Sequence, residues 1–172
     1  MNEPTAGPSI LAARRWLAGE AIPSINGQIS EWGQSYRSYR MTWSVDFPVA
    51  LYEERHTFID EFGFSCPNAE AIDLLIRHAP LLEIGAGTGF WARLLHDRGA
   101  DLIASDPRIE RFHFEHARYA VPGRWWDLQG KTAVRRWPER NIFCSWPSLN
   151  KTWLRQGAKA MRPGRVLLCV VE

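Results

Sequence analysis

A glycine-rich turn between an apolar tetrapeptide and an amphipathic segment limits the fold of this chain more than any other feature. Residues 81–84 are apolar except for Glu83, and three glycines follow them within five positions. Apolar side chains then recur at helical spacing over 90–95, and a second apolar run covers 101–106. Strand, glycine turn, helix and strand in this order predict a βαβ unit, whose two strands run parallel.

Further elements of the same two kinds flank this unit. Helical spacing predicts helices over 11–17, 49–62, 67–79, 131–137 and, after a Ser148 cap, 153–161. Pro67 is expected in the first turn of the third of these helices. Short apolar runs predict strands over 119–121, 141–146 and 166–171, and Gly99 is expected to be left-handed after the helix at 90–95. Alternating strands and helices over residues 67–172 predict an α/β doubly wound, mostly parallel sheet.

Length, apolar runs and cysteine spacing narrow the class of protein. A chain of 172 residues makes one compact domain, here divided into a helical and irregular N-terminal extension (1–62) and a sheet domain (63–172). No apolar run reaches the roughly 18 residues that span a bilayer, and the N-terminus lacks the pattern of a secretory signal. Cys66, Cys144 and Cys169 lie far apart in sequence without metal-site spacing. These features predict a cytoplasmic protein without disulfides.

Charge is unevenly distributed along the chain. Residues 1–80 hold six basic and ten acidic side chains, whereas residues 81–172 hold fifteen and nine. A basic half can attract a polyanion, but this charge density is more typical of a solvated face, so nucleic acid is not the favoured partner.

The glycine turn predicts a ligand site at the carboxyl ends of the strands. A glycine turn that opens a helix is expected to present free N–H groups and the positive end of the helix dipole. The spacing is G-x-G-x-G with Phe90 where a dinucleotide site has its third glycine, and Glu83 would repel a diphosphate. Asp106 ends the second strand, where it can accept hydrogen bonds from ribose hydroxyls or cap a turn before Pro107.

These residues resemble a known family. The segment Leu82–Ala92 with its glycines, together with the acid of Ala104-Ser105-Asp106, is similar to motif I and the following acid of the class I S-adenosylmethionine-dependent methyltransferases. The likeness extends to Phe143–Pro147 and to the Arg162-Pro163-Gly164 turn, and covers residues 62–172. It implies a Rossmann-like sheet with strand order 3-2-1-4-5, S-adenosyl-L-methionine as cofactor and methyl transfer to an unidentified acceptor.

The resemblance also implies a set of site residues. Glu83 would orient the turn or the cofactor's amino group, Asp106 would hold the ribose, and Asp127 would contact adenine. The methionine moiety and ribose would pack against the glycine turn, from Gly85, Ala86, Gly87 and Gly89. Phe90 and Trp91 would flank the cofactor, and packing in the core explains these two side chains equally well. Cys144, Ser145 and Trp146 are the acceptor-site candidates, each of them open to a purely structural role. Trp146-Pro147 lacks the polar start expected for methylation of a nitrogen on a nucleic-acid base.

The class I fold places two more strands after the fifth, and this sequence stops at Glu172. Strand 166–171 is therefore expected at an exposed apolar edge, covered by the N-terminal segment or by a second copy in a homodimer, unless the chain is a fragment. Two alternatives stay open: an inactive or truncated Rossmann-like module for cofactor binding or assembly, and a nicotinamide-dependent oxidoreductase. His113 and His116 have spacing that could touch a metal, but no further cluster completes the site, so solvated or capping histidines are expected and no metal.

Overall fold

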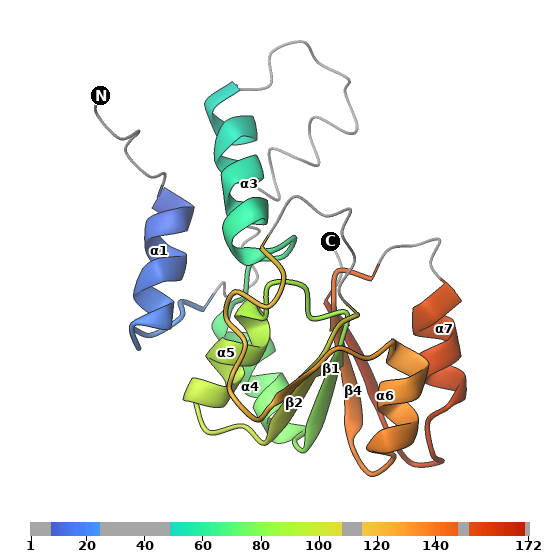
Figure 1. The fold of residues 1–172 in the computed structure, drawn as a ribbon. Coiled ribbons are helices and arrows are strands. Elements are labelled where there is room, and N and C mark those ends of the chain that lie inside the picture. Colours follow the sequence, from blue (N-terminus) through green and yellow to red (C-terminus); the bar gives the residue numbers. More distant parts are fainter. Residues whose placement is uncertain (1–7, 25–48, 108–114, 148–151, 171–172) are drawn as a thin grey trace, which may run out of the picture.

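The computed structural model describes residues 8–24, 49–107, 115–147 and 152–170. It contains a five-stranded sheet flanked by helices on both faces (Figure 1). In chain order the described elements are α1 (Pro8–Leu17), α3 (Val49–Phe62), α4 (Ala69–Arg77), β1 (Leu81–Ile84), α5 (Phe90–Asp97), β2 (Leu102–Ser105), β3 (Trp125–Trp126), α6 (Gly130–Arg136), β4 (Asn141–Ser145), α7 (Thr152–Lys159) and β5 (Leu167–Val170).

All strand pairings are parallel, and the strand order is β3-β2-β1-β4-β5. This confirms the predicted α/β, Rossmann-like class and the order 3-2-1-4-5. β1 lies at the centre, with Glu83 opposite Ala104 on β2 and Phe143 on β4. The third strand was predicted at 119–121, and this is wrong. Residues 116–119 form a turn, and the strand lies at Trp125–Trp126 instead.

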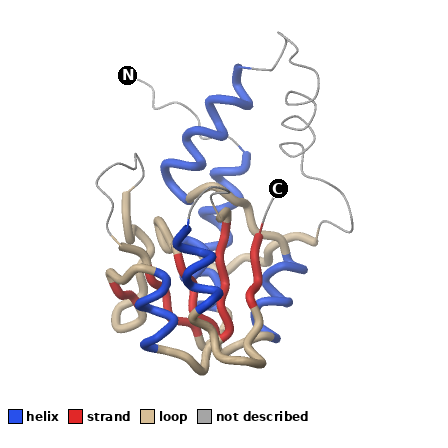
Figure 2. The backbone as a smooth tube through the Cα atoms, turned by 90° about the vertical axis from the view of Figure 1, so that its right-hand side faces the viewer, coloured by secondary structure: helices blue, strands red, loops and turns tan. Residues whose placement is uncertain are grey.

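Alternating side chains of the strands supply the two hydrophobic layers. Leu81 and Leu102 face α1, α3, α4 and α5, whereas Leu82 and Ile103 face α6 and α7. Strands buried on both faces in this way read as nearly continuous apolar runs, which is why 81–84 and 101–106 were recognisable in the sequence. Side-on, Figure 2 shows the same layers, with α3 beyond one end of the strands.

Capping residues mark the start of α4, before β1, and the end of α5, after it. The Asn68 side chain accepts a hydrogen bond from the Ala71 N–H at 2.8 Å and caps α4. Pro67 therefore precedes the helix rather than standing in its first turn. Gly99 follows α5 with a φ of 84°, which confirms the predicted left-handed position after that helix.

The N-terminal helices pack on the sheet domain through aromatic and polar contacts. Phe58 and Phe62 of α3 are buried against Phe90 of α5. On α1, Arg14 pairs with Glu61 through two hydrogen bonds of 2.9 and 2.8 Å. The same hydrophobic cluster contains residues of α1, α3 and β1. These contacts place α3 beside the glycine turn, at the carboxyl ends of the strands (Figure 1).

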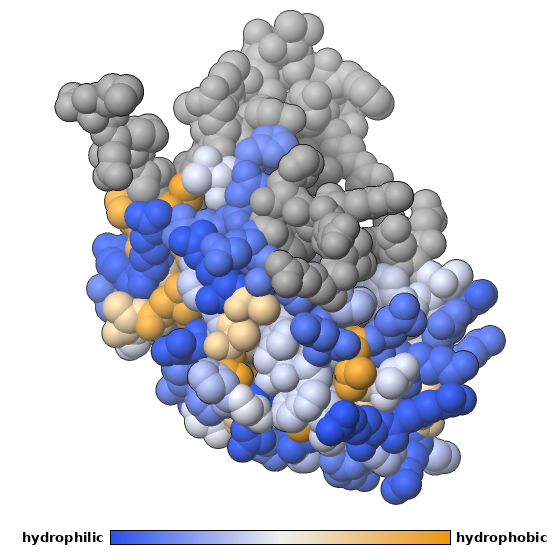
Figure 3. Space-filling view, in the orientation of Figure 1, coloured by the Kyte–Doolittle hydropathy of each residue, from blue (hydrophilic) through white to orange (hydrophobic). Residues whose placement is uncertain are grey.

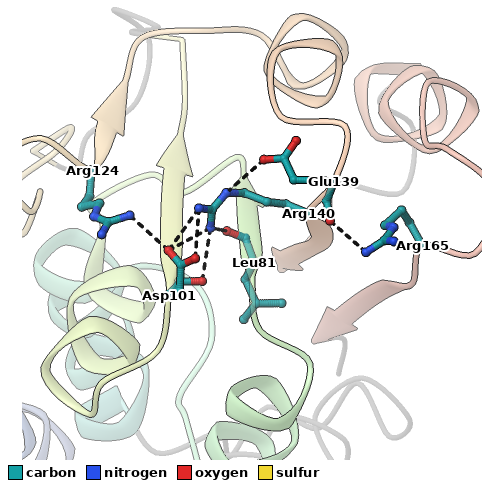
Figure 4. Close-up of polar contacts among 6 residues, drawn as sticks. All are labelled: Leu81, Asp101, Arg124, Glu139, Arg140 and Arg165. Carbon is teal, nitrogen blue, oxygen red and sulfur yellow. Dashed lines mark hydrogen bonds and ion pairs between the residues drawn. The ribbon is translucent and has the colours of Figure 1, made fainter.

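An arginine at the opposite end of the sheet joins the amino ends of three strands. Arg140, just before β4, contacts both carboxylate oxygens of Asp101 at 3.1 Å and the carbonyl oxygen of Leu81 at 3.2 Å (Figure 4). Arg124, before β3, reaches the same Asp101 at 3.1 Å. Because this cluster lies at the amino ends of the strands, it stabilises the sheet and takes no part in a site at the glycine turn.

The outer strand and the surface complete the described fold. β5 is the last strand of the sheet in the described part of the chain, as expected for an edge; Cys169 within it and Val166 just before it are exposed. Within the described ranges, no helix has the length and apolar character needed to cross a membrane. The face shown in Figure 3 is mainly hydrophilic, with apolar residues in separate small patches.

Candidate functional site

The glycine turn satisfies most of its own N–H groups, which corrects the expectation that it would present them to a ligand. The amides of Gly85 and Ala86 donate to the Ser105 carbonyl oxygen at 2.9 and 3.4 Å, and that of Gly89 donates to Ala86 at 2.8 Å. The Gly87 amide donates to Asp106 Oδ2 at 2.8 Å. A diphosphate needs several unpaired amides converging on its oxygens, so this turn is poorly suited to one.

Two of the three glycines are required by the protein's own packing. A Cβ on Gly85 would lie 2.8 Å from the ring of Trp153 on α7, and φ at Gly85 is +74°. A Cβ on Gly89 would lie 3.2 Å from the Trp125 ring and 3.3 Å from the Ala120 backbone nitrogen, with φ at +82°. Both positions therefore need glycine for a left-handed backbone and for close approach. Gly87 has a φ of 57° and contributes its amide to Asp106.

Glu83 is a carboxylate without exposed surface in the central strand. Neither of its oxygens has a hydrogen-bond partner of good geometry among the described residues. Burial, and to a lesser degree the nearby Asp106, raise the pKa of Glu83 well above its ordinary value, while the Ser145 hydroxyl and the Ala92 amide lie close enough to oppose this shift in part. A buried, unpaired acid next to a glycine turn is rare in a core that serves packing alone.

Asp106 follows β2 directly and stands beside the turn. Its Oδ2 accepts the Gly87 amide, while Oδ1 lies 3.8 Å from His116 Nε2. Burial raises the pKa of Asp106, and Asp127 adds to the shift; the Gly87 amide and His116 oppose it. One carboxylate oxygen is therefore held by the protein, and the other faces His116.

Asp127 follows β3 directly and is exposed. Its Oδ1 accepts a hydrogen bond of 3.0 Å from Trp125 Nε1. The structure thus brings together the three predicted acids, from the carboxyl-terminal part of β1 and from the ends of β2 and β3. In the described residues, none of the three forms an ion pair with lysine or arginine.

Phe90 and Trp91, the predicted flanking side chains, lie in the hydrophobic core. Phe90 is 1% exposed and packs against Phe62. Trp91 is 3% exposed, donates to the backbone oxygen and hydroxyl of Ser65, and packs on Phe143. Packing in the hydrophobic core, rather than contact with a cofactor, therefore explains the positions of both rings. Ala86 is also buried, in the same cluster.

Cys144 and Ser145, adjacent in sequence, face opposite sides of the sheet. Cys144 has no exposed surface and belongs to the hydrophobic layer under α6 and α7. Burial, with smaller contributions from Cys169 and the two nearby acids, raises the pKa of its thiol. Ser145 lies on the other face, next to Glu83. Among these acceptor-site candidates, Ser145 rather than Cys144 shares a face with the acids.

Trp146 holds an unusual backbone conformation just beyond β4. Its φ is 57°, a left-handed value that is uncommon for a bulky residue, and its amide donates to the Val170 carbonyl at 2.9 Å. The ring stacks on Phe64, with centroids 6.3 Å apart, and the guanidinium of Arg55 lies 5.8 Å from the ring centroid. Trp146 therefore joins the carboxyl end of β4 to α3 and to the segment that follows α3.

His116 is the residue of this region that sequence reasoning misjudged. Its side chain is 17% exposed and lies edge-on against Trp125, with ring centroids 5.3 Å apart, so it is neither solvated nor a helix cap. His113 and Ser148 lie outside the described residues. In the part of the chain that the structure describes, no group of three or more His, Cys, Asp or Glu side chains is placed to hold a metal ion.

Comparison with models of known families, with curated proteins and with solved structures found no match to this chain. The fold and the arrangement of its side chains are therefore the observations from which a function is argued.

Proposed function

We propose that this chain binds S-adenosyl-L-methionine and transfers its methyl group to an acceptor molecule. The observation that carries the proposal is the set of three acids, Glu83, Asp106 and Asp127, at the carboxyl-terminal side of three neighbouring strands. Carboxylates only accept hydrogen bonds and attract cations. They match a ligand with an ammonium, a sulfonium, ribose hydroxyls and an adenine amino group.

The residues present fit this cofactor in distinct ways. Asp106 Oδ1 would hold the sugar, since its Oδ2 is already taken by the Gly87 amide. Asp127, exposed at the end of β3, would accept from the adenine amino group through the oxygen that Trp125 leaves free. Glu83 would act as a buried acid beneath the turn, near Ser145 and the Ala92 amide in the first turn of α5. The cofactor would supply an activated methyl group on sulfur.

Methyl transfer depends on alignment of donor and acceptor more than on acid–base catalysis. The acceptor would approach from the end of β4, where Ser145 lies on the same face as Glu83 and Trp146 is held by its contacts to Phe64 and Val170. A nicotinamide dinucleotide is disfavoured because the amides that would bind its diphosphate are engaged within the protein.

A second candidate function is a module that binds no cofactor and serves assembly. The packing of Trp153 against Gly85 and of Trp125 against Gly89 favours it, because this packing explains both glycines without a ligand. Glu83 argues against this second candidate, since a purely structural turn has no need of a buried acid whose oxygens lack hydrogen-bond partners in the described residues.

Calorimetric titration with S-adenosylhomocysteine and with NAD separates the candidates. We expect micromolar binding of the first and none of the second. Asp106→Asn should weaken binding by about 1–3 kcal/mol, because hydrogen bonds to a charged acceptor are lost. The matched control is Asp73→Asn, which changes an exposed acid on α4 and should leave the affinity unaltered. Wild-type protein that binds neither compound would refute the proposal, and transfer of labelled methyl to a panel of acceptors tests the reaction itself.

A further inference from the structure

His116 and Asp106 leave two polar atoms facing each other without a direct hydrogen bond. His116 Nε2 is buried and has no hydrogen-bond partner in the described residues, and Asp106 Oδ1 lies 3.8 Å away. This separation exceeds the usual limit of about 3.2 Å for a hydrogen bond from nitrogen to oxygen. A buried ring nitrogen without a partner costs free energy, so a third group between the two atoms would be stabilising.

Both side chains are fixed by other contacts. The Gly87 amide holds Asp106 through Oδ2. The turn that carries His116 is bound to the glycine turn by two hydrogen bonds, from the Ala117 amide to the Gly87 oxygen at 3.0 Å and from the Tyr119 amide to the Thr88 oxygen at 2.8 Å. Ala117 adopts a left-handed φ of 61° to make this connection. The gap between the two polar atoms is therefore a built feature of the fold.

We propose that His116 is a second sugar-binding residue, which together with Asp106 forms hydrogen bonds to one ribose hydroxyl of the ligand. A hydroxyl oxygen can stand about 2.8 Å from both atoms, donating its proton to Asp106 Oδ1 and accepting the proton of His116 Nε2–H. This inference rests on the proposed function and extends it by naming the group that His116 recognises.

Other ligand groups fit the pair less well. When the proton of His116 is on Nε2, an ammonium group can donate to Asp106 but leaves the Nε2–H unpaired. A metal ion would need further ligands, and the described residues place none there. With the proton on Nε2, a ligand hydroxyl satisfies the carboxylate and the imidazole N–H at the same time. A site that engages one hydroxyl from both sides discriminates strongly against an analogue that lacks it.

Calorimetry with S-adenosylhomocysteine and its 2′-deoxy and 3′-deoxy analogues tests the inference. Wild-type protein should bind one of the two deoxy analogues about ten- to a hundredfold more weakly than the parent compound. His116→Leu should weaken binding of the parent compound about tenfold and reduce that discrimination. His116→Gln should recover part of both, because its amide can donate in place of Nε2. The matched control, His96→Leu near the carboxyl end of α5, should change neither.

The outcomes separate this inference from the function on which it rests. If wild-type protein binds S-adenosylhomocysteine and His116→Leu binds it as tightly and with equal discrimination, the role of His116 is wrong and the cofactor site stands. If wild-type protein binds none of the three compounds, both are wrong. If His116→Leu does not fold, the wild-type comparison decides alone, and equal affinity for all three compounds overturns the inference.

Discussion

Replacing Glu83 by glutamine should change the pH dependence of stability in a defined direction. Burial raises the pKa of Glu83 in the folded state well above its ordinary value of 4.5, and the charge of Asp106 adds to the shift. The folded protein therefore retains this proton at pH values where the unfolded chain has lost it. The stabilisation is complete below pH 4.5 and is lost as the pH rises through the folded-state pKa.

The size of the effect follows from linkage. Between the ordinary and the raised pKa, Glu83 is ionised in the unfolded chain and protonated in the folded protein. Each pH unit in this interval lowers the free energy of unfolding by up to about 1.4 kcal/mol. Glutamine has nearly the same shape and carries no charge, so Glu83→Gln should resemble the protonated wild type near pH 5. At pH 8 the variant should be the more stable protein by about 1–3 kcal/mol, because the unfolded wild type has lost the Glu83 proton that the folded protein still retains.

Urea unfolding, followed by circular dichroism at intervals from pH 5 to pH 8, measures this difference. The exposed Asp73 gives a matched control, because Asp73→Asn should shift stability by a nearly constant amount across the range. A gap between wild type and Glu83→Gln that stays constant with pH would refute the reasoning, since Glu83 would then ionise in the folded protein as it does in water. The same variant should bind S-adenosylhomocysteine more weakly if the buried acid serves the cofactor.

Two further substitutions test the packing around the sheet. Arg140→Lys should lower the free energy of unfolding by about 1–2 kcal/mol in urea titration, because an ammonium group cannot bridge both oxygens of Asp101, and the half-exposed carboxylate limits the loss; an unchanged midpoint would show that the cluster contributes nothing. Gly85→Ala should cost about 1–3 kcal/mol more than Gly99→Ala, since both have positive φ but only the first meets the Trp153 ring; equal losses would show that Trp153 moves aside freely.

Local patterns were sufficient to predict the central part of the fold. The apolar runs at 81–84 and 141–146 and the glycines between strand and helix depend on near neighbours in sequence, and they correctly predicted parallel strands at the centre of the sheet. The strand order was implied by the resemblance to a known family. The same reasoning misplaced the third strand. Tyr119 reads as a strand residue because it is apolar and aromatic, yet its ring packs on Phe62 and Phe90 from a turn.

The candidate site divides in the same way. The sequence placed Glu83 in the first strand and Asp106 at the end of the second, because parallel strands bring their carboxyl ends to one edge. Asp127 was named only through the resemblance, since the third strand was predicted at 119–121 and lies at Trp125–Trp126. It did not show that the amides of the turn are paired internally, since their acceptors lie at Ser105 and Asp106, about twenty positions along the chain. No local signal marks such partners.

The sequence by itself determined that two acids, Glu83 and Asp106, and a glycine turn meet at one end of a parallel sheet, because strand direction and turn geometry depend on short segments. Only the tertiary structure decided that Phe90 and Trp91 face the core, that Cys144 and Ser145 serve opposite faces, and that His116 stands opposite Asp106. Those outcomes depend on which surfaces pack together. Packing depends on the shapes and burial of side chains that are far apart in sequence, so local sequence patterns do not predict it.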